Sequence, residues 1–368
     1  MKGHIKQRGP NTWAIVIPDG TKRRWFTYHG NKRGAQVECA RLIGEVQSGA
    51  VSAAPARLST GAFLTRWLEH IRSQVSPGSL QRYGSIIRAI SPLIGHTPLA
   101  KLQPLDISTA LAKLQEGGLS RATVKLTFKA LRQALKQGQR WNLVGRNATD
   151  GLDAPRVEKR RMVVLDDSQT ARLLEMVRGS ELFAPVLIAI MTGARRGEIL
   201  ALRWRDVTGS TVSITASVEQ TMQGIREKPP KNGRGRSVHA PALLIEELRQ
   251  HRIRQAEALL ALGIRLTDDS HICVRSDGSQ MEPIWVTKTF GDFIAGSGLP
   301  RIRFHDLRHG FASHLLGSNT HAKVVSEMLG HSSIGVTMDI YGHIAPTLQS
   351  DAAAKVDSTM RAALAKIR

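Results

Sequence analysis

Residues 329–342 read LGHSSIGVTMDIYG, and this short stretch decides how the rest of the chain is interpreted. It places Tyr341 ten residues after His331, at the end of a short amphipathic segment for which we predict a helix. The 368-residue chain holds only three tyrosines, the others being Tyr28 and Tyr83. Tyr83 falls among apolar residues at helical spacing, which predicts a core position. Tyr341 is either another core aromatic residue or a side chain with a chemical task.

The charge of the chain is its strongest compositional feature. Lys and Arg number 52 against 30 Asp and Glu, which gives a formal net charge of +22 and a pI near 10.8. Charge density is highest in residues 1–158, which hold 24 basic and 9 acidic residues. Because every phosphate contact releases condensed counterions, an excess of this size favours a nucleic-acid partner over a merely solubilising surface.

The sequence also argues against several classes of protein. No apolar run approaches the roughly 20 residues that span a bilayer, and the opening MKGHIKQRGPNTW lacks the apolar centre of a signal peptide. Cys39 and Cys273 form no CxxC pair, so neither a disulfide framework nor a cysteine zinc site is expected. There is no Walker loop and no dinucleotide fingerprint in the sequence. We expect a soluble, cytoplasmic protein that uses no cofactor and contacts no membrane.

Composition and periodicity divide the chain into segments. Residues 1–50 contain short strand-like runs and one helix, which predicts a small α+β domain. Residues 51–60 are small, polar and proline-bearing, as a linker is. Residues 61–155 carry apolar residues at helical spacing and predict an all-α domain. Residues 160–350 predict a mainly α domain with a small β-sheet, and residues 351–368 predict a tail helix with one narrow apolar stripe.

Two sets of basic residues are candidate DNA contacts. Arg23 and Arg24 lie beside aromatic residues in the first segment, where a small sheet could place a basic, aromatic face on DNA. Lys125, Lys129 and Arg132 recur at three- and four-residue steps on one predicted helix of the second segment. A phosphate backbone fits such a stripe. Both sets are equally compatible with ordinary solvated faces.

Residues 191–204, MTGARRGEILALRW, carry the first piece of candidate chemistry in the largest domain. We predict a helix that begins at the Thr-Gly turn, with Arg195 in its first turn, where backbone N–H groups favour an anion. Glu198 lies three residues further and shares a helix face with Arg195. It is therefore expected to orient the guanidinium.

Residues 228–241, KPPKNGRGRSVHAP, predict a hairpin with a glycine-containing tip. This arrangement places Lys231 on a basic loop. Lys228 is a rival for any task that needs a lysine here, although the PKN sequence before a basic strand favours Lys231.

Residues 303–316, RFHDLRHGFASHLL, predict a helix on which His305 and Arg308 point the same way. His305 and His309 have the spacing of a zinc pair. However, the glutamate of an HExxH motif is missing and no third ligand is evident, so no metal is expected.

Each of these pieces has an ordinary explanation, such as a surface ion pair, a loop lysine or a core aromatic residue. Taken together, two arginines, a lysine, two histidines and a tyrosine are the groups needed to cleave a phosphodiester without metal. Arginines neutralise the charge that develops on the phosphate oxygens. A tyrosine attacks once nearby cations stabilise its phenolate, and a lysine or imidazole protonates the departing sugar oxygen.

The sequences TGARRGEILALRW, HDLRHGFASHLL and LGHSSIGVTMDIYGH resemble the signature boxes of the tyrosine recombinase family, and the order of segments resembles phage-type integrases. The resemblance covers nearly the whole chain. It implies an arm-type DNA-binding domain, a helical core-binding domain and a catalytic domain with the tyrosine recombinase fold. Gly310 departs from the small hydroxyl residue that the family often has there, which we expect to matter little.

The resemblance also assigns roles to particular residues. It implies the catalytic set Arg195, Lys231, His305, Arg308, His331 and Tyr341, supported by Glu198. Tyr341 would form a 3′-phosphotyrosyl link, and Lys231 would protonate the 5′ oxygen. The arginines would clamp the phosphate and His331 would hydrogen-bond it, while His305 would assist proton transfer from the tyrosine.

The function implied is site-specific recombination by a phage or mobile-element integrase. Such an enzyme would act as a homotetramer on two double-stranded attachment sites through a Holliday junction, with a DNA-bending accessory protein and a directionality factor as further partners. The tail helix, residues 351–368, would pack on a neighbouring subunit, the alternative being that it folds back on its own domain. Two other functions stay open: a type IB-like topoisomerase, and a DNA-binding regulator with an inactive recombinase domain.

Overall fold

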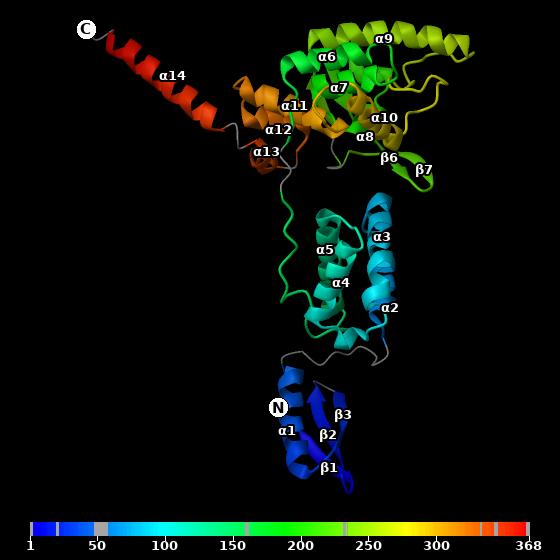
Figure 1. Ribbon diagram of the computed structural model, residues 1–368, viewed down its shortest axis with the longest axis vertical. Coiled ribbons are helices and arrows are strands. Elements are labelled where there is room, and N and C mark those ends of the chain that lie inside the picture. Colours follow the sequence, from blue (N-terminus) through cyan, green and yellow to red (C-terminus); the bar gives the residue numbers. More distant parts are fainter. Residues whose placement is uncertain are drawn as a thin grey trace. The chain divides into compact units, whose positions relative to one another are not determined.

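The computed structural model describes residues 3–19, 22–47, 58–158, 162–230, 233, 235–331, 333–341 and 345–365. The chain divides into two compact units, Met1–Lys159 and Arg160–Arg368 (Figure 1). Among the helices in these ranges, none has the length and apolar character needed to cross a bilayer.

A three-stranded antiparallel sheet and one helix form the N-terminal part of the first unit. The strands are β1 (His4–Gly9), β2 (Thr12–Asp19) and β3 (Lys22–His29), in that order, followed by α1 (Lys32–Gln47). Ile15 and Ile17 project from the same face of β2 because side chains alternate along a strand. They pack with Cys39 and Leu42 of α1 in a separate small core.

The described remainder of the first unit, residues 58–158, is helical (Figure 1). Its helices are α2 (Thr60–Ile71), α3 (Pro77–Ile94), α4 (Pro104–Glu116) and α5 (Arg121–Arg140), with a short 3₁₀ turn at Leu99–Lys101. The side chains of Ser59, Ser76 and Ser120 cap three of these helices by accepting a hydrogen bond from a backbone N–H. Tyr83 packs edge-on against Trp67 with ring centroids 5.3 Å apart, in agreement with a core role.

The second unit is mainly helical. Its helices are α6 (Asp167–Val177), α7 (Phe183–Thr192), α8 (Arg196–Ala201), α9 (Ala242–Ala261), α10 (Pro283–Gly296), α11 (Phe304–Gly317), α12 (Ala322–Leu329), α13 (Ile334–Tyr341) and α14 (Ala345–Ala365), with a 3₁₀ turn at Trp204–Asp206. Helix α7 is buried along nearly its whole length, as its sequence FAPVLIAIMT requires. Helix α11 packs on α7, and α12 packs on α13.

Two small sheets flank these helices. One has the order β4 (Val207–Thr208), β5 (Thr211–Ile214) and β8 (Arg236–His239), and the other pairs β6 (Ser217–Thr221) with β7 (Gly224–Lys228). The hairpin predicted over residues 228–241 is therefore wrong, because β7 and β8 belong to different sheets. The two prolines at 229–230 have no N–H to continue the ladder of β7. Residues 271–275, HICVR, take part in isolated bridges, Arg203 with His271 and Val274 with Gln280.

Candidate active site

Arg195 lies at the junction of α7 and α8. Helix α7 ends at Gly193, whose φ of 62° suits glycine, and Arg195 is the N-cap of α8 rather than a residue of its first turn. The Glu198 carboxylate accepts hydrogen bonds from the backbone N–H of Arg195 at 2.9 Å and from its Nη1 at 2.8 Å. Both bonds run from Arg195 to one carboxylate, which is why a glutamate three residues into the helix orients the arginine.

Arg308 reaches the same place from α11. Its side chain is buried, with 3% of the residue exposed. Nη1 donates to the carbonyl oxygen of Gly193 at 2.7 Å, and Nη2 donates to that of Leu329 at 2.7 Å. Both arginines therefore lie at the turn that ends α7: Arg195 follows this turn in the chain, and Arg308 bonds the carbonyl oxygen of Gly193 within it.

The C-terminal end of α12 is where the basic side chains meet. The carbonyl oxygens of residues 328–330 each accept a hydrogen bond from a different arginine. Arg236 donates to Met328 at 2.7 Å, Arg308 to Leu329 at 2.7 Å, and Arg195 to Gly330 at 2.9 Å. Unpaired carbonyls and the negative end of the helix dipole make this position favourable for cations. Gly330 ends the helix with φ of 63°, and His331 follows directly.

Arg236, the first residue of β8, was not among the residues expected at the site. Its Nη2 donates to Glu198 at 2.7 Å, while its Nε holds the carbonyl oxygen of Met328. Glu198 is only 1% exposed. Burial raises the pKa of its carboxyl, but Arg236 and Arg195 outweigh burial and hold the pKa below its usual value. In the sequence Arg236 is one basic residue among 52, and only the tertiary structure brings it to Glu198.

The two histidines of the expected set are neutral at physiological pH. Burial lowers the pKa of His305 to about 4, helped by the nearby charges of His309 and Arg308. Burial, then Arg308 and Arg195, lowers the pKa of His331 to about 4 as well. The Nδ1 of His331 is 2.7 Å from the hydroxyl oxygen of the fully buried Thr337, which orients the ring.

Two members of the expected set fall at the limits of the described structure. Lys231 lies outside the described residues. Tyr341 is the last residue of α13, and its side chain also lies outside the described part. Lys228, the rival of Lys231, ends β7 and forms an ion pair with Glu219 at 2.9 Å.

The expected DNA contacts lie on the first unit. Arg23 is exposed on β3, and the side chain of Arg24 lies outside the described part. Lys129 and Arg132 are exposed on α5, and Lys125 is half-buried beside them. In the described ranges, no cluster of three His, Cys, Asp or Glu side chains could hold a metal ion.

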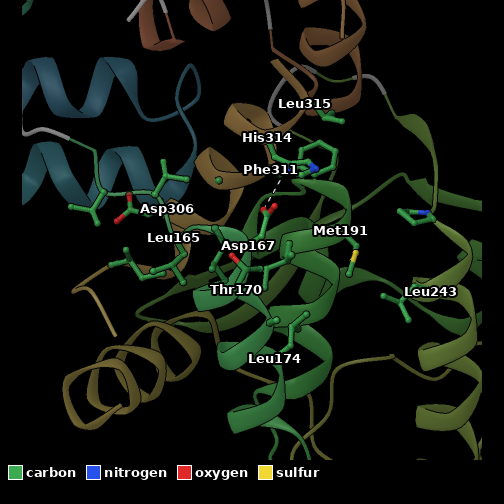
Figure 2. Close-up of a pocket in the computed structure, with 18 residues that line it drawn as sticks. Leu165, Asp167, Thr170, Leu174, Met191, Leu243, Asp306, Phe311, His314 and Leu315 are labelled. Carbon is green, nitrogen blue, oxygen red and sulfur yellow. Dashed lines mark ion pairs between the residues drawn. The ribbon is translucent and has the colours of Figure 1, made fainter. Parts of the chain in front are cut away.

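An apolar groove lies on another side of α11 (Figure 2). Its cavity of about 630 Å³ is lined by side chains of α6, α7 and α11, together with residues 163–165 and the start of α9. Leu174, Met191, Leu243 and Phe311 surround it in Figure 2, where a dashed line marks the ion pair between Asp167 and the His314 ring. Leu243, in the wall of this groove, is 51% exposed.

A family model described as "Phage integrase family" matches residues 163–347, half of the chain, and one described as "Phage integrase, N-terminal SAM-like domain" matches residues 61–115. The chain belongs to the phage integrase family. A tyrosine recombinase XerC-like protein of Caldanaerobacter subterraneus subsp. tengcongensis is 29% identical over 201 residues, which cover 50% of this chain and 51% of that protein. The chain therefore spans about half the length of this relative.

Solved structures of integrases share the fold. The Tn1549 transposon integrase in complex with circular intermediate DNA superposes with a TM-score of 0.68 at 17% identity, covering 77% of this chain and 95% of that one. A lambda integrase tetramer bound to a Holliday junction gives a TM-score of 0.57 at 20% identity over 89% of this chain and 95% of that one. The predicted family and the predicted multidomain fold class are both confirmed.

Proposed function

We propose that the chain is a site-specific DNA recombinase of a phage or other mobile element, which cuts and rejoins strands through a 3′-phosphotyrosyl intermediate and a Holliday junction. The observation that carries the proposal is the meeting of Arg195, Arg308 and the turn before His331 at one helix end, with Tyr341 on the next helix, α13. Membership of the phage integrase family and the shared fold with a transposon integrase support it.

The arginines suit the task of binding a scissile phosphate. Charge grows on the non-bridging oxygens as the phosphorus becomes five-coordinate, and fixed donors stabilise it most when they need not reorganise. Arg195 is fixed in advance by its bonds to Glu198 and to the carbonyl oxygen of Gly330, and Arg308 by its bonds to the carbonyl oxygens of Gly193 and Leu329. We assign Arg195 and Arg308 to this clamp, and Glu198 to its support.

The remaining groups account for the proton and bond changes. The Tyr341 oxygen attacks phosphorus, the bond to the 5′ oxygen breaks, and Lys231 gives that oxygen its proton. His305 accepts the proton of the tyrosine, a role for which a neutral ring is required. His331, held at Nδ1 by Thr337, donates from Nε2 to a phosphate oxygen. Because the phosphotyrosyl ester retains the bond energy, rejoining needs no ATP.

We assign the DNA contacts by segment. Residues 1–50 would bind arm-type sites through Arg23 and Arg24, and residues 61–155 would bind the core site through the basic face of α5. Residues 160–350 would hold the catalytic site. A DNA-bending protein and a directionality factor would complete the assembly on attachment sites.

The tail offers a means of joining subunits. Val356, Met360 and Leu364 lie at four-residue steps on α14, and are 62%, 55% and 62% exposed. An exposed apolar stripe of this kind favours a partner surface. The groove beside α11 is apolar as well, so we propose that the tail of one protomer occupies the groove of the next protomer in a homotetramer. The lambda integrase neighbour is itself a tetramer on a Holliday junction.

The decisive experiment traps the covalent intermediate. A DNA substrate nicked near the cleavage point loses a short fragment after attack and so retains the protein. Wild-type protein should form an adduct, and Tyr341→Phe should bind the same DNA but form none, because only the attacking oxygen is lost. Equal trapping of the Phe variant would transfer the nucleophile to another residue. Adduct formation and relaxation of supercoils without joining of two sites would instead indicate a type IB-like topoisomerase.

A further inference from the structure

Of the three arginines at the end of α12, Arg236 is the one outside the expected catalytic set. Arg195 and Arg308 each bond a carbonyl at the end of α12 and are expected to face the phosphate. Arg236 bonds a carbonyl at the same helix end, and its Nη2 donates to the same Glu198 carboxylate that orients Arg195. Its side chain is only 12% exposed.

We infer that Arg236 is a positioning residue: it holds Glu198, and through it Arg195, in register with the turn that precedes His331. The inference rests on the proposed recombinase function and adds a residue outside the expected catalytic set. Three elements far apart in the sequence, α8, β8 and the end of α12, are joined by this one side chain. A guanidinium can do this because its donors form a rigid planar fork.

The surroundings leave the side chain little freedom. Its backbone is fixed by pairing of Arg236 with Ile214 across β5 and β8. A methyl group added at Gly330 would lie 2.9 Å from Nη1 of Arg236, so the turn before His331 closes directly on the guanidinium. An ion pair with Glu198 on one side and a hydrogen bond to the carbonyl oxygen of Met328 on the other complete the enclosure. Movement of Arg236 would be transmitted to both Arg195 and His331.

The first test measures the single-turnover rate of adduct formation on nicked DNA, with DNA affinity measured separately. Arg236→Ala should slow adduct formation roughly 100-fold, as small misplacements of catalytic groups do, while leaving DNA affinity unchanged. Arg236→Lys should recover only part of the lost rate, because an ammonium keeps the charge but cannot bridge both partners. Arg205→Ala, which removes an exposed arginine paired with Asp269, is the control and should cleave normally.

The second test asks whether Arg236 acts through Glu198. If the two form one unit, the double variant Arg236→Ala/Glu198→Gln should be no slower than the slower single variant. The inference would be overturned if the rate losses of the two single variants multiply in the double variant, or if Arg236→Ala cleaves at the wild-type rate. Thermal unfolding of each variant separates these effects from failure to fold.

The third test does not depend on cleavage. In NMR spectra of the labelled full chain, Arg236→Ala should shift the ring signals of His331, while those of His251, which bonds the carbonyl oxygen of Ile272, should stay in place. Unchanged His331 signals would contradict the inference even in a chain that cleaves no DNA. A wild type that forms no adduct, by contrast, counts against the proposed function alone.

Discussion

At the scale of single residues, the site keeps two imidazoles neutral in the middle of a positive cluster. The pKa of His305 and of His331 is lowered from 6.5 to about 4 by burial and by neighbouring charge. The unfolded chain binds these protons as pH falls through about 6.5, whereas the folded chain binds them only near pH 4. Their contribution to stability is thus fully present above pH 6.5 and is lost as pH falls toward 4.

We therefore expect the variant His305→Gln/His331→Gln to depend less on pH than the wild type does. Between a pH of about 7 and about 5, its thermal unfolding midpoint should fall by a smaller amount. His239→Gln removes an exposed histidine of the same unit and serves as the control. Parallel decreases in wild type and double variant would show that these two rings do not carry the acid sensitivity.

Lys231 can be tested at the same scale by changing the leaving group. A 5′-bridging phosphorothiolate departs as a thiolate and needs little protonation. Lys231→Ala should cleave ordinary DNA poorly and the sulfur substrate at nearly the wild-type rate. Lys228→Ala is the matched control, since Lys228 is paired with Glu219. If the sulfur substrate restores cleavage by Lys228→Ala and not by Lys231→Ala, then Lys228 is the residue that protonates the leaving oxygen.

At the scale of elements, the site depends on the close packing of the α7 end against α11 and α12. Gly193 adopts φ of 62°, and a methyl group there would overlap the Phe311 ring and approach Leu329 Cδ2 to 2.8 Å. Gly209 has a similar φ of 57° but faces open space. Both glycines spare the chain a left-handed strain of roughly 1–2 kcal/mol, and only Gly193 also makes room for neighbouring helices.

Gly193→Ala should therefore destabilise the chain more than Gly209→Ala does. The difference between the two losses in unfolding free energy is the cost of overpacking, about 1–3 kcal/mol. Calorimetric unfolding midpoints of the two variants measure it, and single-turnover cleavage should slow only for Gly193→Ala because the Gly193 carbonyl holds Arg308. Equal midpoints would show that α11 and α12 move aside without cost.

At the scale of the whole molecule, the proposal that the tail contacts another subunit can be tested by deletion. Deleting residues 352–368 should leave binding to a single DNA site and the unfolding midpoint near normal, because Val356, Met360 and Leu364 bury little in the protomer. Tetramer formation on paired sites and recombination should both fall sharply. Light scattering and a two-site recombination assay measure these outcomes.

Two results would count against a subunit contact. A truncated chain that still forms synaptic tetramers and recombines at the wild-type rate has no need of the tail. A truncated chain that unfolds would show that α14 stabilises its own domain. Leu243→Asp in the exposed wall of the groove should reproduce the effect of the deletion if the groove receives the tail.

Much of this protein was determined by its sequence alone. Apolar spacing, serine caps and an all-apolar stretch placed most helices, because helix formation and burial of a face are local properties. The pairing of Arg195 with Glu198 was also predictable, since residues three apart on a helix are neighbours. The family boxes pointed to the same residues.

Tertiary structure alone decided how those pieces meet. The sequence suggested that β7 and β8 pair with each other, but strand partners are chosen by packing between distant segments, and each strand found another neighbour. Likewise nothing local marks Arg236, 38 residues from the carboxylate that it bonds. The end of α12 collects three arginines because its carbonyls need donors that its own helix cannot supply. That requirement is met only across the fold.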